Sequence, residues 1–228
     1  MAVSGSNDFE LDVADYVEEA FERCGLEVRT GYDLKTATRS LNLMLADWAN
    51  RGLNRWTMTQ TSTTLTAGTA NYNLGIDTID ILSAVIRTGT GTNQSDISLS
   101  RLSRDGYLSI TNKNTTGKPT QFYVDRQINP IVKLWPTPDS VETYTLVFDR
   151  LVRMDDADSS TNTLDVPFRF YPCLAAGLAY YIALKKAPQR VQILKAVYEE
   201  EFERAASEDR DRATLSLTPS RDYYTFIS

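Results

Sequence analysis

The sequence predicts an α+β protein: a four-helix body built from both chain ends, with an inserted antiparallel β module and an extended C-terminal tail. Two observations predict this class. Residues 8–24 and 33–52 near the start, and 168–185 and 189–212 near the end, carry apolar side chains at three- and four-residue steps, which is the period of a helix. Between these pairs, Thr-rich and β-branched runs alternate with Gly- and Pro-containing turns, which is typical of strands.

The first predicted helix, residues 8–24, has apolar side chains on one face and acidic side chains on the other. Asn7 or Asp8 is suited to cap its start, and Gly25 can adopt the left-handed conformation that ends a helix. A second amphipathic helix is expected over 33–52. The short connection between them favours an antiparallel pair.

The middle of the chain is predicted to form strands, with one short helix over 103–110. Asn129-Pro130 and the Pro136 to Asp139 stretch mark turns. The expected strands are 56–65, 79–87, 121–126, 131–135 and 141–153.

Helical character returns after the polar loop 155–165. Residues 168–185, from Phe168 to Leu184 and beyond, are apolar almost all round, so this helix is expected to be buried. The last helix is predicted to place Val191, Leu194, Val197 and Tyr198 inside. The expected divisions are an N-terminal helix pair (1–52), the β module (53–154), a loop with the C-terminal helix pair (155–212) and the tail (213–228).

Composition limits the possible chemistry. The 228 residues include no histidine, which removes the commonest general base and most zinc sites. The net charge of −6 disfavours sequence-specific nucleic-acid binding, which depends on Lys and Arg. Cys24 and Cys173 fall on apolar helix faces and are expected to be buried, reduced thiols.

No membrane partner is expected, because no run approaches the roughly 18 apolar residues of a bilayer span and residues 1–8 carry no export signal. The loop 155–165 begins like a calcium loop, but Thr161 stands where Gly is needed and Pro167 where a bidentate Glu belongs. We therefore predict no catalytic, cofactor-binding or metal-binding residues, and no cofactor.

Two segments near the end of the chain are candidates for protein contacts. Residues 199–212 are strongly charged, which fits either a solvated helix end or a helix packed beside copies of itself. The tail is unusually apolar for a terminus and is expected to dock on another protein, with docking on its own body as the alternative. Its candidate docking residues are Leu215, Leu217, Pro219, Tyr223, Tyr224, Phe226 and Ile227.

Residues 117–138 read GKPTQFYVDRQINPIVKLWPTP, a Gly-x-Pro turn, two strands and a Pro-x-Pro turn. This pattern resembles the head-to-tail adaptor family of short-tailed phages, also called tail tubular protein A or tail accessory factors. The run 41–48 (LNLMLADW) and the order of helix pair, β module, helix pair and tail are similar to that family as well. The residues that carry the turn motif are Gly117, Pro119, Trp135, Pro136 and Pro138.

The resemblance implies a non-enzymatic structural subunit of the virion that binds the portal protein and joins the DNA-filled head to the tail. It implies a ring, of twelve copies in the virion, assembled from subunits that are monomeric when free. The tail would dock on the portal, and the β module would face the tail nozzle or tail tube protein. An acidic bore would let DNA pass during ejection without sequence-specific binding.

Two other functions compete with this one. Abundant Asp and Glu would allow a tail-associated cell-wall hydrolase that uses two carboxylates. A connector or completion protein of a longer-tailed phage would share the same physics but have different neighbours.

Overall fold

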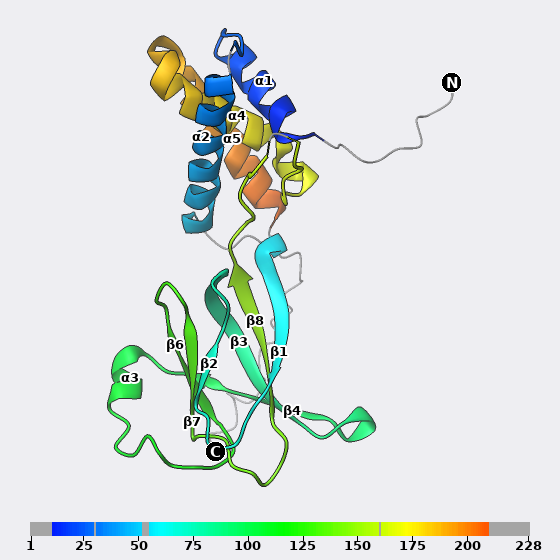
Figure 1. Ribbon diagram of the computed structural model, residues 1–228, viewed down its shortest axis with the longest axis vertical. Helices are drawn as coiled ribbons and strands as arrows, with labels where there is room; N and C mark the ends of the chain where they lie inside the picture. Colours follow the sequence, from blue (N-terminus) through cyan, green and yellow to red (C-terminus); the bar gives the residue numbers. More distant parts are fainter. Residues whose placement is uncertain (1–10, 30, 52–54, 160, 210–228) are drawn as a thin grey trace, which may run out of the picture.

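The computed structural model describes residues 11–29, 31–51, 55–159 and 161–209. The molecule is elongated, with the four long helices gathered at one end and the strands, with one short helix, at the other (Figure 1). Helices from the two chain ends pack together, and two four-stranded sheets are inserted between them, which confirms the α+β class. The four helices of the body are α1 (Val13–Arg23), α2 (Gly31–Asn50), α4 (Tyr171–Lys186) and α5 (Val191–Glu208).

A capping box fixes the start of α1. The backbone N–H of Asp15 donates to Asp12 Oδ1 at 2.9 Å, and the backbone N–H of Asp12 donates to Asp15 Oδ2 at 3.1 Å. The prediction of Asn7 or Asp8 as the cap was therefore wrong, because the helix begins several residues later than its apolar pattern suggested. Gly25 follows the helix with φ +69°, as predicted.

Helix α4 lies at the centre of the helical body and contacts each of the other three helices. Its side chains Cys173, Leu174 and Leu178 are fully buried, which confirms the predicted buried helix. Phe168 and Leu184 depart from that prediction, with 68% and 52% of their surfaces exposed. Phe168 belongs to a 3₁₀ turn before α4, and Leu184 lies on the solvent side of the last α4 turn.

Helix α5 closes the helical core. Leu194 and Tyr198 are buried, but Val197 is 40% exposed and lies outside the core, contrary to the prediction. The indole Nε1 of Trp48, on α2, donates a 2.8 Å hydrogen bond to the hydroxyl of Tyr198. Both side chains are fully buried, so this bond satisfies a polar group deep between α2 and α5.

Both cysteines are free and buried, as predicted. Burial raises the pKa of the Cys173 thiol to about 12, and nearby Glu201 adds to the shift. Burial also raises the pKa of Cys24, whose Sγ lies 3.2 Å from the carbonyl oxygen of Ala179. Both thiols therefore behave as small packing groups.

The two sheets have the strand orders β1-β8-β3-β4 and β2-β7-β6-β5. The first contains β1 (Met58–Thr64), β8 (Thr145–Val152), β3 (Thr78–Thr88) and β4 (Ser95–Ser98). The second contains β2 (Asn71–Asn73), β7 (Ile131–Trp135), β6 (Gln121–Asp125) and β5 (Ser100–Arg101). Strands β5 and β6 pair in parallel, so the prediction of a wholly antiparallel module was wrong at this edge. The predicted short helix is present as α3 (Arg104–Leu108).

Side chains from both sheets form a second hydrophobic core, separate from the helical one. Ile81 and Ile86 of β3, Val132 of β7 and Leu146 of β8 are fully buried in it. Buried and partly exposed residues alternate along β6 and β7, and β3 and β8 of the other sheet add side chains to the same core, so the sheets pack face to face as a sandwich. Strand β8 begins at Thr145 and not at residue 141, which leaves a loop at the start of the predicted strand.

Candidate interaction surfaces

The turn-motif residues Gly117, Trp135 and Pro136 meet at one corner of the β module. The backbone N–H of Gly117 donates to the carbonyl oxygen of Thr137 at 2.9 Å. A Cβ added to Gly117 would lie 3.7 Å from the Pro136 ring, and the Trp135–Pro136 peptide bond is cis. Trp135 Nε1 donates to the carbonyl oxygen of Asn112 at 3.0 Å. The motif therefore holds residues 112–117 against the end of β7.

The two remaining motif prolines, Pro119 and Pro138, are buried in the same region. The carbonyl oxygen of Pro138 accepts a 2.9 Å hydrogen bond from the backbone N–H of Gly68, which ties in the loop after β1. The structure thus brings all five predicted motif residues into one corner. These residues fix the loops at this corner. Pro119 and Pro138 are closed to solvent, so they are not free to contact another molecule.

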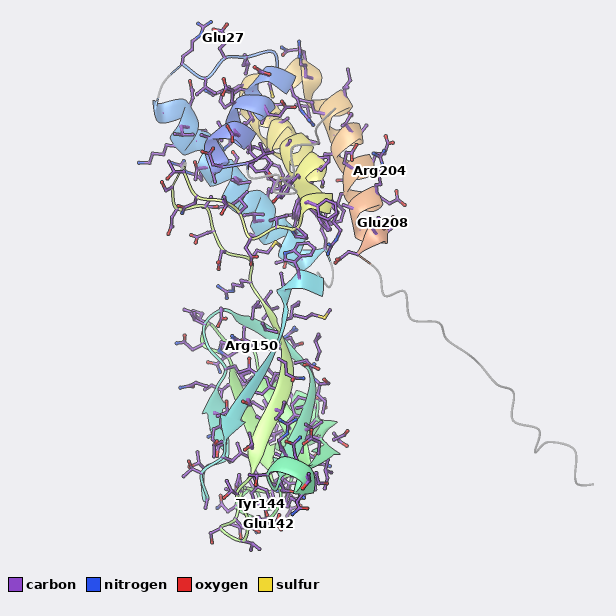
Figure 2. All side chains as sticks on the ribbon, turned by 90° about the vertical axis from the view of Figure 1, so that its right-hand side faces the viewer. Glu27, Glu142, Tyr144, Arg150, Arg204 and Glu208 are labelled. Atoms are coloured by element: carbon purple, nitrogen blue, oxygen red, sulfur yellow. The ribbon has the colours of Figure 1, made fainter. Side chains whose placement is uncertain are left out.

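That corner supports a tip at the end of the β module farthest from the helices, where Figure 2 shows Tyr144 and Glu142. The side chain of Asp139 accepts hydrogen bonds from the Tyr144 hydroxyl and the Val141 backbone N–H, each at 3.0 Å. Burial of Tyr144, together with this contact to Asp139, raises the pKa of its hydroxyl. Val141 is 80% exposed on this braced loop, so the tip offers an apolar contact point on a rigid support.

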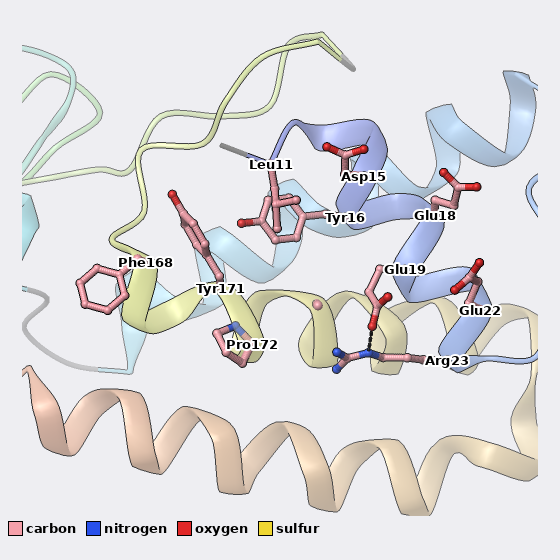
Figure 3. A pocket seen from close by; sticks show the side chains of 11 residues that line it. Leu11, Asp15, Tyr16, Glu18, Glu19, Glu22, Arg23, Phe168, Tyr171 and Pro172 are labelled. Atoms are coloured by element: carbon pink, nitrogen blue, oxygen red, sulfur yellow. Dashed lines mark hydrogen bonds and ion pairs between the residues drawn. The ribbon is translucent and has the colours of Figure 1, made fainter. Parts of the chain in front are cut away.

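A groove lies at the other end of the molecule, between α1 and the start of α4 (Figure 3). Its volume is about 860 Å³. The apolar part is made by Leu11, Phe168, Tyr171 and Pro172. The exposed side of α1 supplies an acidic rim, so this surface is apolar at one end and negative along its length. The rim consists of Asp15, Glu18, Glu19 and Glu22, with Arg23 as its one cation.

Tyr16 is the buried polar residue of this groove. Its side chain is only 2% exposed, and its ring contacts the ring of Tyr171 edge-on at 5.8 Å between centroids. Within the described residues its hydroxyl has no hydrogen-bond partner. Burial raises its pKa well above the ordinary value, with Tyr171 and Asp15 adding to the effect, so the hydroxyl stays protonated and able to donate.

Several acidic side chains of α5 form ion pairs with arginines. Arg204 pairs with Glu200 and Glu201, each at 3.1 Å. Arg51 of α2 binds Glu199 through two nitrogens, at 2.9 and 3.2 Å. Bidentate pairing of this kind fixes geometry, so part of the charge in 199–212 serves packing within the chain.

The loop 155–165 supports α2 and does not form a calcium loop in its described part. The backbone N–H of Ala157 donates to Asn42 Oδ1 at 2.8 Å, and Asn42 Nδ2 donates to the carbonyl oxygen of Ala157 at 3.3 Å. Over residues 11–29, 31–51, 55–159 and 161–209, no group of three His, Cys, Asp or Glu side chains is arranged to hold a metal ion. In the same ranges, no helix is long and apolar enough to cross a bilayer.

The predicted docking tail, Leu215 to Ile227, lies outside the described residues. Sequence reasoning missed both the tip around Val141 and the groove around Phe168. Val141 was assigned to a strand and Phe168 to a buried helix. The proline-rich turn before Val141, and Pro167 just before Phe168, were the signals that could have separated these residues from the adjoining elements.

The fold defines an elongated α+β protein with a groove on its helical body and an exposed loop at the far end of its β module. The family model described as SU10 adaptor protein matches residues 10–221. The chain therefore belongs to the SU10 adaptor protein family, which confirms the resemblance to phage adaptors and makes it a structural component of the virion.

No curated protein matches the chain. Among solved structures, it is similar to a chain from the neck of an empty GTA particle computed with C6 symmetry. The two share 11% sequence identity over 88% of this chain and 93% of the other, with a TM-score of 0.28. At that level the match carries no argument about assembly.

Proposed function

We propose that this protein is a non-enzymatic adaptor of the virion neck, which binds the portal protein and connects the DNA-filled head to the tail. The observation that carries the proposal is the placement of two unlike surfaces at opposite ends of an elongated member of an adaptor family (Figure 2). One end is a helical body and the other is a braced β tip. A molecule that joins two different partners needs two such separated surfaces.

The β tip is the proposed contact for the tail nozzle or tail tube protein. Its loops are held by the turn motif and by Asp139, so little conformational entropy is lost when a partner covers Val141. An exposed aliphatic side chain on a rigid loop suits a shallow apolar pocket of the partner.

The apolar tail is the proposed contact for the portal. Leu215, Leu217 and the three aromatics Tyr223, Tyr224 and Phe226 would bury a large apolar area in an extended segment.

In the virion, copies of the chain would form a ring, of twelve by the family resemblance, through which DNA passes. The net charge of −6 suits a channel that does not hold phosphate.

Deletion of residues 215–228 tests the portal contact. The truncated chain is expected to fold like the full chain by circular dichroism but to lose co-sedimentation with purified portal protein. Val141→Asp is the matched variant, since it alters the β tip and is expected to keep portal binding while losing the tail partner. Full portal binding by the truncated chain would refute the assignment of the tail.

Imaging of the intact particle tests the location. Density for this chain between head and tail of a short-tailed particle is the expected result. A position in a longer tail would favour the connector or completion protein instead, and turnover of purified peptidoglycan by the chain would favour the hydrolase.

A further inference from the structure

The outer face of α2 differs in character from the α1/α4 groove. Tyr32, Lys35, Arg39 and Leu43 follow one another at three- and four-residue steps, so they share one side of the helix. Tyr32 is 72% exposed and Leu43 is 57% exposed. Lys35, Arg39 and Leu43 line a groove of about 660 Å³, whose one acidic lining residue is Asp158. This basic and apolar surface is named the α2 face.

The charges of the two surfaces are complementary and largely unused within the chain. Among the described residues, Lys35 and Arg39 form no ion pair, and neither do Glu18 and Glu22 on the rim of the α1/α4 groove. Each of these four side chains is exposed. In an isolated subunit the charges therefore face solvent, where they can meet opposite charges on another molecule.

The spacing of the charges also matches. Glu18 and Glu22 are four residues apart on α1, as are Lys35 and Arg39 on α2, which corresponds to about 6 Å along either helix. With the helices antiparallel, Arg39 lies opposite Glu18 when Lys35 lies opposite Glu22. The same alignment carries Leu43 toward the apolar end of the groove, where Figure 3 shows Leu11 and Phe168.

The Tyr16 hydroxyl is a buried polar group beneath the α1/α4 groove. A buried hydroxyl without a partner is destabilising, and such groups are rare in folded proteins. Tyr16 lines the groove, and Figure 3 shows its hydroxyl directed toward Tyr171 beneath the apolar end. Because this hydroxyl is closed to solvent, a docked molecule does not reach it in this conformation, and the charges along the groove are what identify the occupant.

We infer that the occupant of the α1/α4 groove is the α2 face of a second copy of this chain. The two surfaces share no lining residue, so each copy can use its groove for one neighbour and its α2 face for the next. Such a heterologous contact repeats from copy to copy and produces a ring when the rotation closes. The inference deepens the proposed function, since it assigns the subunit contacts of the proposed ring.

Paired charge reversals test the contact. Glu18→Lys with Glu22→Lys, or Lys35→Glu with Arg39→Glu, is expected to weaken association between copies on the order of tenfold or more, measured by sedimentation at low salt with the chain free or mixed with portal protein. Mixing the two variants is expected to restore assembly, because each then carries the charges that the other needs. Glu142→Lys with Glu203→Lys is the control for the Glu18 and Glu22 pair, with the same change of charge at exposed positions outside both grooves.

Disulfide trapping tests the geometry. Glu18→Cys combined with Arg39→Cys in one chain is expected to give a covalent ladder beyond the dimer on oxidation, with the full chain free or mixed with portal protein. Each single variant is expected to give none. The native Cys24 and Cys173 are only 2% and 0% exposed, so they do not compete.

The contact is refuted if no ladder forms in either condition, if Glu18→Cys alone yields dimers, or if the mixed charge variants do not reassemble. Portal co-sedimentation separates this failure from failure of the proposed function. Portal binding without a ladder removes the inference alone, whereas a ladder without portal binding removes the proposed function alone.

Discussion

Gly177 lies where α2 and α5 cross α4, and its replacement by alanine tests how tightly the helical body is packed. A Cβ at this position would lie 2.7 Å from Tyr198 Cε2 and would also overlap Met44 Sδ. The Met44 side chain is flexible. The Tyr198 ring is not, because its hydroxyl holds the Trp48 indole at 2.8 Å. The added methyl group must therefore push α4 and α5 apart.

Two opposing effects decide how far Gly177→Ala changes the free energy of unfolding. Alanine is favoured over glycine inside a helix by about 1 kcal/mol. Overpacking of a core costs about 1–3 kcal/mol, and two short contacts on opposite helices place Gly177→Ala in the upper part of that range. We expect a net loss of about 1–2 kcal/mol in the free energy of unfolding of the helical body. Helix propensity alone predicts the opposite, a gain in the free energy of unfolding.

Urea unfolding followed by circular dichroism in the helical band measures this change, because all the long helices belong to the helical body. Gly31→Ala is the matched control, since nothing lies within 4 Å of the added Cβ at that helix start. Its stability is expected to stay within about 0.5 kcal/mol of the wild type. A Gly177→Ala protein as stable as the wild type or more stable would refute the close crossing.

Three further changes test other parts of the helical body. Tyr198→Phe leaves the buried Trp48 N–H without its acceptor, and the free energy of unfolding is expected to fall by about 1–3 kcal/mol in urea titrations. Asp12→Ala removes one half of the capping box with Asp15 and is expected to cost about 1 kcal/mol in the same assay. Cys173 makes stability depend on alkaline pH. Its thiol has a pKa of about 12 when folded against 9.0 as its ordinary value, so only the unfolded chain loses this proton between those values. The contribution of this thiol to stability is therefore retained below pH 9. Above pH 9 the thiol is expected to lower the free energy of unfolding by about 1.4 kcal/mol per pH unit, and Cys173→Ala should reduce that slope.

Each of these has its own control. Tyr32→Phe changes a hydroxyl on a side chain that is 72% exposed and should leave stability unchanged. For the cap, Asp12→Asn keeps a good N-cap acceptor and should retain most of the stability lost with alanine. An unaltered alkaline slope in Cys173→Ala would show that other groups, such as the buried Tyr16 and Tyr198, dominate the titration.

Local sequence patterns were sufficient where neighbouring residues set the structure. The helical period located all four helices of the body, and the 131–135 strand was predicted with the bounds observed for β7. Errors occurred where the decisive contact comes from far along the chain. The parallel pairing of β5 with β6 and the strands of two to four residues, β2, β4 and β5, depend on backbone partners that no local period reveals.

The candidate surfaces divide in the same way. The turn motif from Gly117 to Pro138 was visible in the sequence because glycine and proline restrict the backbone locally. Exposure of Phe168 and Val141 was not visible, because burial depends on whether another element covers a side chain.

The sequence by itself determined the α+β class, the order of the helices and of the longer strands, the buried thiols and the family resemblance, since periodicity and turn chemistry act over a few residues. Only the tertiary structure decided which helix faces remain uncovered, that Gly177 marks a helix crossing, and that Glu18 and Glu22 border a groove while Lys35 and Arg39 border another. Those features arise from packing between separate helices and loops, and a local pattern does not encode such contacts.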